Sequence, residues 1–447
     1  MHTASHVGGV ETWLDRICEY LPRHGFEPIV GLVRGQKYND PTRYLQYHHG
    51  IRAVEVDGRG LNREGRVRAL MRCIRKVRPG IVVPLGIVEA NEATIRCKKL
   101  GMDLRLGVHA QGNLPPMLAD LAFYRDWIDR VVCPGRLTAR TLLEWAGFDP
   151  DRVQVVANGA DAPTHGKTIR AAGEPLRLGY VGRLSFSDKR VLDLVDLRRE
   201  LDALGTAYRL DIYGDGPCRD ELQTAFADCK NVQLHGALHH ADLYRRAFPN
   251  LDALVLTSSS EAFGIVLIEA MMHGVVPVSS RYDGFLAEGL VDEGGNGVSF
   301  DVGDMASAAR HIDKLARDDG LLRLFSERAL AKAANYSWEI ALRKWRGALE
   351  DMLSRPPLLA ADLPKIPAQS SSKLDRIGMP GELADLLRRF RRAAFGPAVA
   401  PGGEEWPLYG RHHSPATIAA VRDALKTLDV VADDARETAR AGRAGPT

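Results

Sequence analysis

The chain has 447 residues, enough for two or three domains, and its 45% apolar and 26% charged residues are ordinary for a globular protein. Its net charge of +3 lacks the strong basic excess of nucleic-acid-binding proteins, so we expect no nucleic-acid partner. Six scattered Cys without a C-x-x-C spacing, no apolar run of membrane-spanning length and no secretory leader predict a cytoplasmic protein with reduced thiols.

The first residues, 1–10, read as a loop, and Glu11–Leu21 reads as a helix. Short apolar runs then alternate with amphipathic stretches over roughly the first 330 residues, in two successive series. We expect strands at Pro28–Val33, Ala53–Val56, Ile81–Leu85, Leu104–His109, Arg130–Cys133, Val153–Val156, Leu176–Val181, Arg209–Tyr213, Val232–Leu234, Ala253–Leu256 and Val275–Val278.

Alternation of this kind predicts parallel sheets with helices on both faces. Because there are two series, we expect an α/β protein with two doubly wound domains, joined by a linker near Asp161–Glu174. A ligand is then expected in a cleft between the carboxyl ends of the two sheets.

The last part of the chain, residues 354–447, is a separate tail. A linker rich in Pro and Ser is followed by an apolar stripe, Leu383, Leu386, Leu387 and Phe390, next to several Arg. Ser414-Pro415 is typical of a helix cap followed by a first-turn proline, so we expect a helix that reaches about Arg440. Nothing in this tail indicates catalytic chemistry.

The segment 258–280 carries the strongest functional pattern. Glu261 falls in a loop, Glu269 falls inside a helix, and Gly264 stands where that helix opens. The helix start offers bare backbone N–H groups and the positive end of the helix dipole, which together attract an anion. An anion site flanked by two carboxylates suits a sugar nucleotide. The alternative is a buried helix with two incidental salt bridges.

The spacing of Glu261 and Glu269, with Phe263-Gly264 between them, resembles the donor-site signature of the family 4 glycosyltransferases, which have the GT-B fold. The resemblance implies that the first Glu contacts the donor sugar and the second contacts the ribose. It also implies donor contacts from Phe263, Gly264, Ile265 and Val266.

Two cations lie in the loop after the first strand of the second series. The string Gly179–Ser185, with Gly182, Arg183 and then Lys189, resembles the phosphate-binding Arg and Lys of the same family. Such cations would stabilise negative charge on a departing diphosphate. The alternative is an ordinary loop with two solvated cations.

Further donor contacts are implied by Gly8 and Gly9 before the first helix, and by Gly214 and Gly216 in a turn that is also compatible with simple turn chemistry. His109 ends a strand at the place where the family has a histidine that faces the donor sugar. It would orient a hydroxyl, although a lone His at a strand end is equally compatible with a structural role.

The resemblance covers about residues 6–352 and implies two Rossmann-like domains facing across a cleft, plus a C-terminal tail. Residues 1–165 would bind the acceptor, residues 172–335 would bind the nucleotide sugar, and residues 336–353 would form a helix that crosses back to the N-terminal domain. In the family an apolar strand precedes the Gly8-Gly9 loop. Here it is missing, so we expect either a start upstream of Met1 or a first sheet without its inner strand.

By resemblance, the protein is a retaining glycosyltransferase that moves a sugar from a nucleoside diphosphate sugar to a hydroxyl acceptor. We expect no metal and no cofactor, because the one Asp-x-Asp lies in a turn at 149–151. Two alternatives remain: a sugar-nucleotide epimerase, or a non-catalytic protein that binds a sugar nucleotide or a partner.

Two basic clusters raise a side hypothesis, a peripheral contact with a membrane at its inner face. The region Arg59–Arg78 carries eight cations around an apolar stripe, and Arg388–Arg392 carries four more. We expect first that the stripe belongs to the core and that the cations form a solvated face; membrane contact is the alternative.

Overall fold

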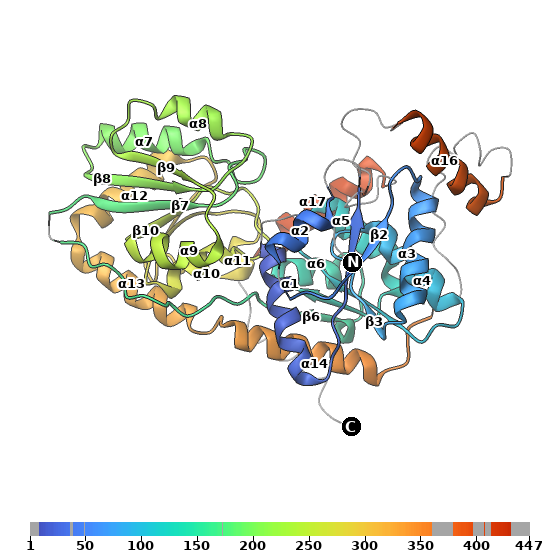
Figure 1. Cartoon of the computed structure of the whole chain (residues 1–447). Helices are drawn as coiled ribbons and strands as arrows, with labels where there is room; N and C mark the ends of the chain where they lie inside the picture. Colours follow the sequence, from blue (N-terminus) through green and yellow to red (C-terminus); the bar gives the residue numbers. More distant parts are fainter. Residues whose placement is uncertain are drawn as a thin grey trace, which may run out of the picture. The chain divides into compact units, whose positions relative to one another are not determined.

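The computed structural model describes residues 9–35, 39–48, 50–171, 173–359, 379–396, 406 and 413–430 (Figure 1). The chain divides into two compact units. Unit 1 comprises residues 1–134, 138–156 and 342–424, and unit 2 comprises residues 135–137, 157–341 and 425–447. One boundary falls within α14 (Trp338–Ser354).

Unit 2 is built on one parallel sheet of six strands in the order β12-β11-β10-β7-β8-β9. The strands are β7 (Leu176–Val181), β8 (Tyr208–Tyr213), β9 (Val232–Gly236), β10 (Ala253–Leu256), β11 (Val276–Ser280) and β12 (Val298–Phe300). The helices are α7 (Asp193–Ala203), α8 (Arg219–Ala225), α9 (His240–Asp242), α10 (Ile265–Met272), α11 (Phe285–Glu288), α12 (Met305–Arg317) and α13 (Asp319–Ala333).

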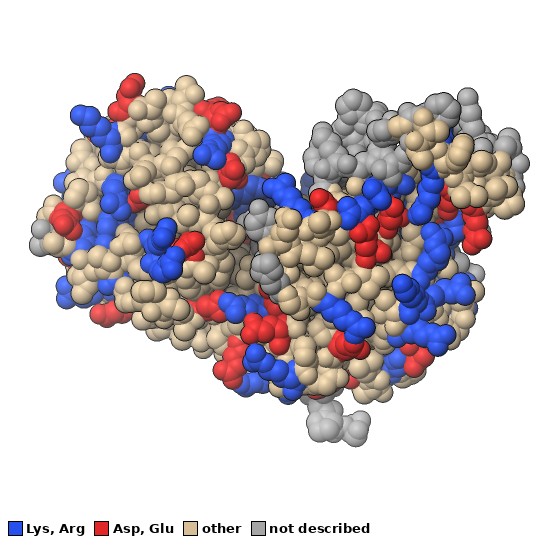
Figure 2. Space-filling model, viewed as in Figure 1, with Lys and Arg blue, Asp and Glu red and all other residues tan. Residues whose placement is uncertain are grey.

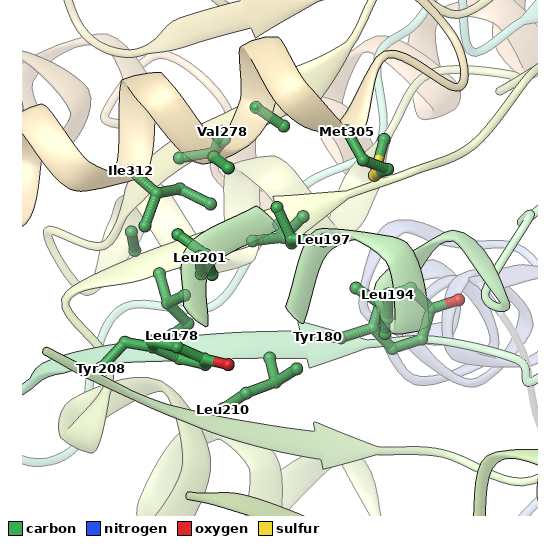
Figure 3. Close-up of a cluster of buried hydrophobic side chains, with 14 of the residues drawn as sticks. Leu178, Tyr180, Leu194, Leu197, Leu201, Tyr208, Leu210, Val278, Met305 and Ile312 are labelled. Carbon is green, nitrogen blue, oxygen red and sulfur yellow. The ribbon is translucent and has the colours of Figure 1, made fainter. Parts of the chain in front are cut away.

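Helices cover both faces of this sheet because its strands are apolar on both sides. In Figure 3, Leu178 and Tyr180 of β7 pack with Leu194, Leu197 and Leu201 of α7 on one face. The other face is covered by a second cluster, in which β10 packs against α10. Unit 2 is therefore a doubly wound α/β unit, as expected.

Unit 1 contains two parallel sheets, of order β1-β2 and β3-β4-β5-β6. The strands are β1 (Val30–Arg34), β2 (Ala53–Asp57), β3 (Ile81–Val82), β4 (Arg105–His109), β5 (Arg130–Cys133) and β6 (Val153–Val155). The helices are α1 (Gly9–Tyr20), α2 (Pro41–Tyr47), α3 (Arg63–Val77), α4 (Val88–Lys99), α5 (Pro115–Tyr124), α6 (Arg136–Glu144), α16 (Gly381–Phe395) and α17 (Pro415–Leu428). Unit boundaries also fall within α6 and α17.

A largely apolar cavity of about 420 Å³ lies in unit 1. It is lined from α1 by Trp13 and Ile17, from β1 by Val30, from β3 by Val82 and from α14 by Leu349, among others. Both sheets of the unit thus contribute to the same cavity, the two-stranded sheet through β1 and β2 and the other through β3.

Strands β1 to β11 lie where the sequence predicts them, whereas β12 was not expected. The tail helix expected to reach about Arg440 is α17, which ends earlier, at Leu428. Ser414 caps it as predicted, because its hydroxyl accepts from the backbone N–H of Thr417 at 3.1 Å. Asp429 and Val430, which follow, have poor helix propensity, and Arg440 lies outside the described residues.

Candidate functional site

The strand order of unit 2 reverses between β7 and β10. The chain proceeds from β7 to β8 and β9 on one side, and from β10 to β11 and β12 on the other. The loops that leave the carboxyl ends of β7 and β10 therefore diverge, and such a switch point is where open α/β sheets bind ligands. The predicted cations follow β7, and Glu261 and Gly264 follow β10.

Lys189 and Glu261 meet at this switch point. The ammonium Nζ of Lys189 lies 2.6 Å from Oε1 of Glu261, and the two side chains are only 19% and 11% exposed. The hydroxyl of Ser258 donates to the same carboxylate oxygen at 2.5 Å. The hydroxyl of Thr257 donates to the carbonyl of Lys189 at 2.7 Å, which joins the two loops. The predicted cation and carboxylate thus form one small, half-buried cluster.

Arg183 lies in the same loop but is 62% exposed, and it pairs with Asp188 at 2.6 Å. Asp188 also accepts from the hydroxyl of Ser185 at 2.8 Å. Burial alone would raise the pKa of the Asp188 carboxyl, but the Ser185 hydrogen bond and the charges of Arg183 and Lys189 together lower it below its usual value. Asp188 therefore holds Arg183 in the loop while the guanidinium stays accessible.

Helix α10 opens next to Glu261 and has no side-chain cap. Its N-cap residue, Gly264, has φ 79°, a left-handed conformation that favours glycine. A Cβ at this position would also lie 3.0 Å from the hydroxyl of Tyr282. The backbone N–H groups of Ile265 and Val266 open the first turn, where the helix dipole is positive. Phe263, just before them, is buried in the core.

Glu269 lies one turn further along α10 and is buried at 8% exposure. Its Oε1 lies 2.8 Å from Nε2 of His240, whose ring centroid lies 4.5 Å from that of Tyr244 in a tilted arrangement. Sequence reasoning missed His240, because no local pattern links it to Glu269 and the contact spans 29 positions. Sequence reasoning also missed Ser258 and Asp188, although both stand next to predicted site residues.

Gly214 and Gly216 stand in the loop after β8 and let it pack against the loop after β7. A Cβ on Gly214 would lie 1.8 Å from the carbonyl oxygen of Gly182, and one on Gly216 would lie 2.5 Å from that of Leu184. A side chain at either position would clash with the backbone, so the packing of the two loops requires glycine at both. The predicted donor contacts of Gly182, Gly214 and Gly216 stay predictions.

His109 lies in unit 1, at the end of β4, and is buried among aromatic rings. Its ring centroid lies 4.5 Å from that of Trp13 and 5.0 Å from that of Trp345. Within the described part of the chain, neither ring nitrogen has a hydrogen-bond partner. Burial lowers the pKa of His109 to about 3, so its ring is neutral near pH 7.

The other predicted residues of unit 1 are Gly8 and Gly9. Gly9 is the exposed first residue of α1, whereas Gly8 lies outside the described residues. Among the residues that the structure describes, no three His, Cys, Asp or Glu side chains are arranged to hold a metal ion. Within the same residues, no helix has the length and apolar content needed to cross a bilayer.

Comparison with family models covers most of both units. Residues 7–162 match the model described as Glycosyltransferase Family 4, and residues 163–332 match the one described as Glycosyl transferases group 1.

Two curated relatives illustrate the likeness. A sulfoquinovosyl transferase of Arabidopsis thaliana is 25% identical over 247 residues, which is 52% of this chain and 46% of the relative. A lipopolysaccharide 1,6-galactosyltransferase of Escherichia coli strain K12 is 23% identical over 320 residues, which is 69% of this chain and 86% of the relative. The chain spans half or less of the length of several of its curated relatives.

Among solved structures, the HepE protein of Anabaena in complex with UDP and glucose superposes with a TM-score of 0.63 at 19% sequence identity. The match covers 77% of this chain and 98% of the other. At this identity the likeness shows a common fold.

Proposed function

Because the chain belongs to the family 4 glycosyltransferases and has the GT-B fold, we propose that it transfers a sugar from a nucleoside diphosphate sugar to a hydroxyl acceptor. The observation that carries the proposal is the half-buried pair of Lys189 and Glu261 beside the uncapped start of α10. It places a cation, a carboxylate and open backbone N–H groups at one switch point.

In the proposed complex, the diphosphate lies at the first turn of α10. The N–H groups of Ile265 and Val266 donate to it, and Lys189 and the accessible Arg183 add positive charge. Glu261 accepts a hydrogen bond from a hydroxyl of the donor sugar. Glu269, oriented by His240, accepts hydrogen bonds from the ribose hydroxyls. Relatives of known structure have been solved with UDP, so UDP is the first nucleotide to test.

The proposed reaction depends on charge stabilisation and on proximity. As the bond from the anomeric carbon to the diphosphate breaks, negative charge grows on the leaving phosphate, where Arg183, Lys189 and the α10 dipole stabilise it. We propose retention at the anomeric carbon. The proposed step uses no metal ion and no cofactor, because the positive charge comes from the protein itself.

His109 is proposed to orient a hydroxyl through its neutral ring, since its lowered pKa disfavours the imidazolium form at neutral pH. The acceptor is proposed as a glycan, a lipid-linked sugar or a small molecule with a free hydroxyl. Curated relatives include enzymes named for lipopolysaccharide and for phosphatidyl-myo-inositol, which supports this range.

The test has two stages. First, calorimetric titration of UDP, GDP and ADP sugars identifies the donor, and we expect one base to bind clearly more tightly than the others. Second, release of nucleoside diphosphate is measured with a panel of hydroxyl acceptors, with and without EDTA. Release only when an acceptor is present, unchanged by EDTA, supports transfer.

Other outcomes of this test contradict the proposal. A change in the donor sugar without release of nucleoside diphosphate would indicate an epimerase. Tight donor binding with no reaction for any acceptor would indicate a binding protein. The anomeric configuration of the product, read by NMR, tests retention.

A further inference from the structure

Helix α16 is attached to unit 1 with its polar side inward. Among the residues of α16 whose burial the structure describes, Ala384 and Asp385 are buried, at 0% and 5% exposure. Arg388, one turn later, has a side chain that is 12% exposed. Amphipathic helices of globular proteins normally bury their apolar face, so this orientation is inverted.

The inward side is fixed by ion pairs with α3. Nε and Nη2 of Arg68 donate to Oδ2 of Asp385 at 3.0 and 2.8 Å, and Nη2 also donates to the carbonyl of Gly381. The guanidinium of Arg388 donates to the other oxygen of Asp385 at 3.0 Å. A Cβ on Gly65 of α3 would lie 2.6 Å from Oδ1 of Asp385, so the helices approach closely here. This anchoring leaves the opposite side of α16 facing outward.

The outward side is apolar over two helical turns. It presents four large side chains at helical spacing, with exposures of 46%, 63%, 40% and 69%: Leu383, Leu386, Leu387 and Phe390. We call this set the outer stripe. A contiguous exposed apolar stripe of this kind marks a surface that binds an apolar partner.

Exposed cations lie on the same helix as the outer stripe and on the neighbouring helix α3. On α16, Arg389 and Arg391 are exposed, and Arg389 also donates to the carbonyl of Asp57. On the neighbouring α3, the second half of the helix and its cap expose four more cations: Arg72, Arg75, Lys76 and Arg78. Figure 1 shows α16 beside α3, and Figure 2 shows Lys and Arg side chains along α3 next to the tan surface of α16.

The first half of the basic region Arg59–Arg78 has a different role. Each of its four arginines forms an ion pair with an acidic residue: Arg59 with Asp57, Arg63 with Glu92, Arg66 with Glu89, and Arg68 with Asp385. The apolar stripe of α3, which includes Val67, Leu70 and Ile74, lies in the core. The exposed cations of this region therefore lie mainly in its second half.

We propose that α16 docks unit 1 on the surface of an anionic lipid bilayer. The outer stripe enters the boundary between headgroups and acyl chains, while Arg389, Arg391 and the exposed cations of α3 contact anionic headgroups. An apolar face bordered by Arg and Lys is typical of helices that lie in the plane of a membrane interface. The proposal is independent of the donor site, so each can fail without the other.

The test is sedimentation of the full chain with two kinds of vesicle: phosphatidylcholine alone, and phosphatidylcholine mixed with phosphatidylglycerol. We expect binding to the mixed vesicles, reversed by added salt. The double variant Leu386→Ser/Phe390→Ser should bind at least about tenfold more weakly, because two large apolar side chains are lost. The double variant Arg72→Gln/Lys76→Gln should also bind more weakly, by about fivefold for each cation removed.

The matched control is Leu324→Ser/Leu330→Ser on α13, where both side chains are 40% or more exposed. It should bind vesicles like the unchanged chain. Equal loss in this control, no binding to mixed vesicles, or binding that ignores salt would overturn the proposal. So would a dimer in lipid-free buffer that Leu386→Ser/Phe390→Ser converts to monomer, because the outer stripe would then bind a second copy.

Discussion

Replacing Lys189 by Met separates the structural role of this side chain from its proposed role in binding the donor. Met is similar in length but has no charge, so the change removes the contact with Glu261 at 2.6 Å. At an effective dielectric constant of about 20, the Coulomb attraction over that distance is about 6 kcal/mol. Desolvation of the two ions offsets most of it, and a charge-assisted hydrogen bond contributes about 2 kcal/mol net.

Lys189→Met should therefore lower the free energy of unfolding by about 2 kcal/mol. It should also weaken UDP binding by roughly tenfold to a hundredfold, because a charge-assisted contact to the diphosphate is lost. Urea unfolding and calorimetric titration with UDP measure the two effects separately.

The double variant Lys189→Met/Glu261→Gln provides the control. A neutral Gln no longer needs the ammonium, so most of the lost stability should return. UDP affinity should stay low, because Glu261 is proposed to contact the sugar and not the diphosphate. The reasoning is refuted if the double variant also recovers UDP affinity, or if Lys189→Met binds UDP normally.

Four further predictions concern single residues of the two units. Arg183→Ala should slow turnover by tenfold or more, on the order of 1.4 kcal/mol, with little loss of stability because the side chain is 62% exposed; steady-state kinetics check this. Glu269→Ala should weaken donor binding by about tenfold, seen by titration with the nucleotide sugar. Gly214→Ala should destabilise unit 2 by more than about 2 kcal/mol, seen by urea unfolding, because its Cβ would clash with a backbone carbonyl. The pKa of His109 is lowered to about 3 in the folded chain, against about 6.5 unfolded, so the neutral ring contributes its full stability above pH 6.5 and this stability is lost as the pH falls. By pH 5 the free energy of unfolding should fall by about 2 kcal/mol on this account, as measured by urea unfolding. A His109→Phe variant should lack this pH dependence.

Most strand positions followed from the sequence, because buried parallel strands are short apolar runs bounded by turns. β12 was missed because it comprises only Val298–Phe300 after a Gly-rich turn, too short to give a pattern. Unit 1 has two separate parallel sheets, and strands of both line one cavity. The sequence led us to expect a missing first strand in this part of the chain. That expectation itself stays a prediction.

The candidate site was only partly predictable. Lys189 and Glu261 were each singled out, but their direct contact arises from the strand order, which the local sequence does not specify. His240 was missed because its contact with Glu269 depends on how the segment after β9 packs on α10. For α16, the spacing of the apolar residues predicts a stripe, whereas the outward direction depends on the ion pair between Arg68 and Asp385.

The central claim is that a nucleoside diphosphate binds at the start of α10, and a crystal structure of the chain with UDP tests it most directly. The account predicts phosphate oxygens about 3 Å from the backbone nitrogens of Ile265 or Val266, with the Lys189 ammonium within hydrogen-bond reach. A diphosphate bound elsewhere, with Lys189 still paired only to Glu261, would contradict it.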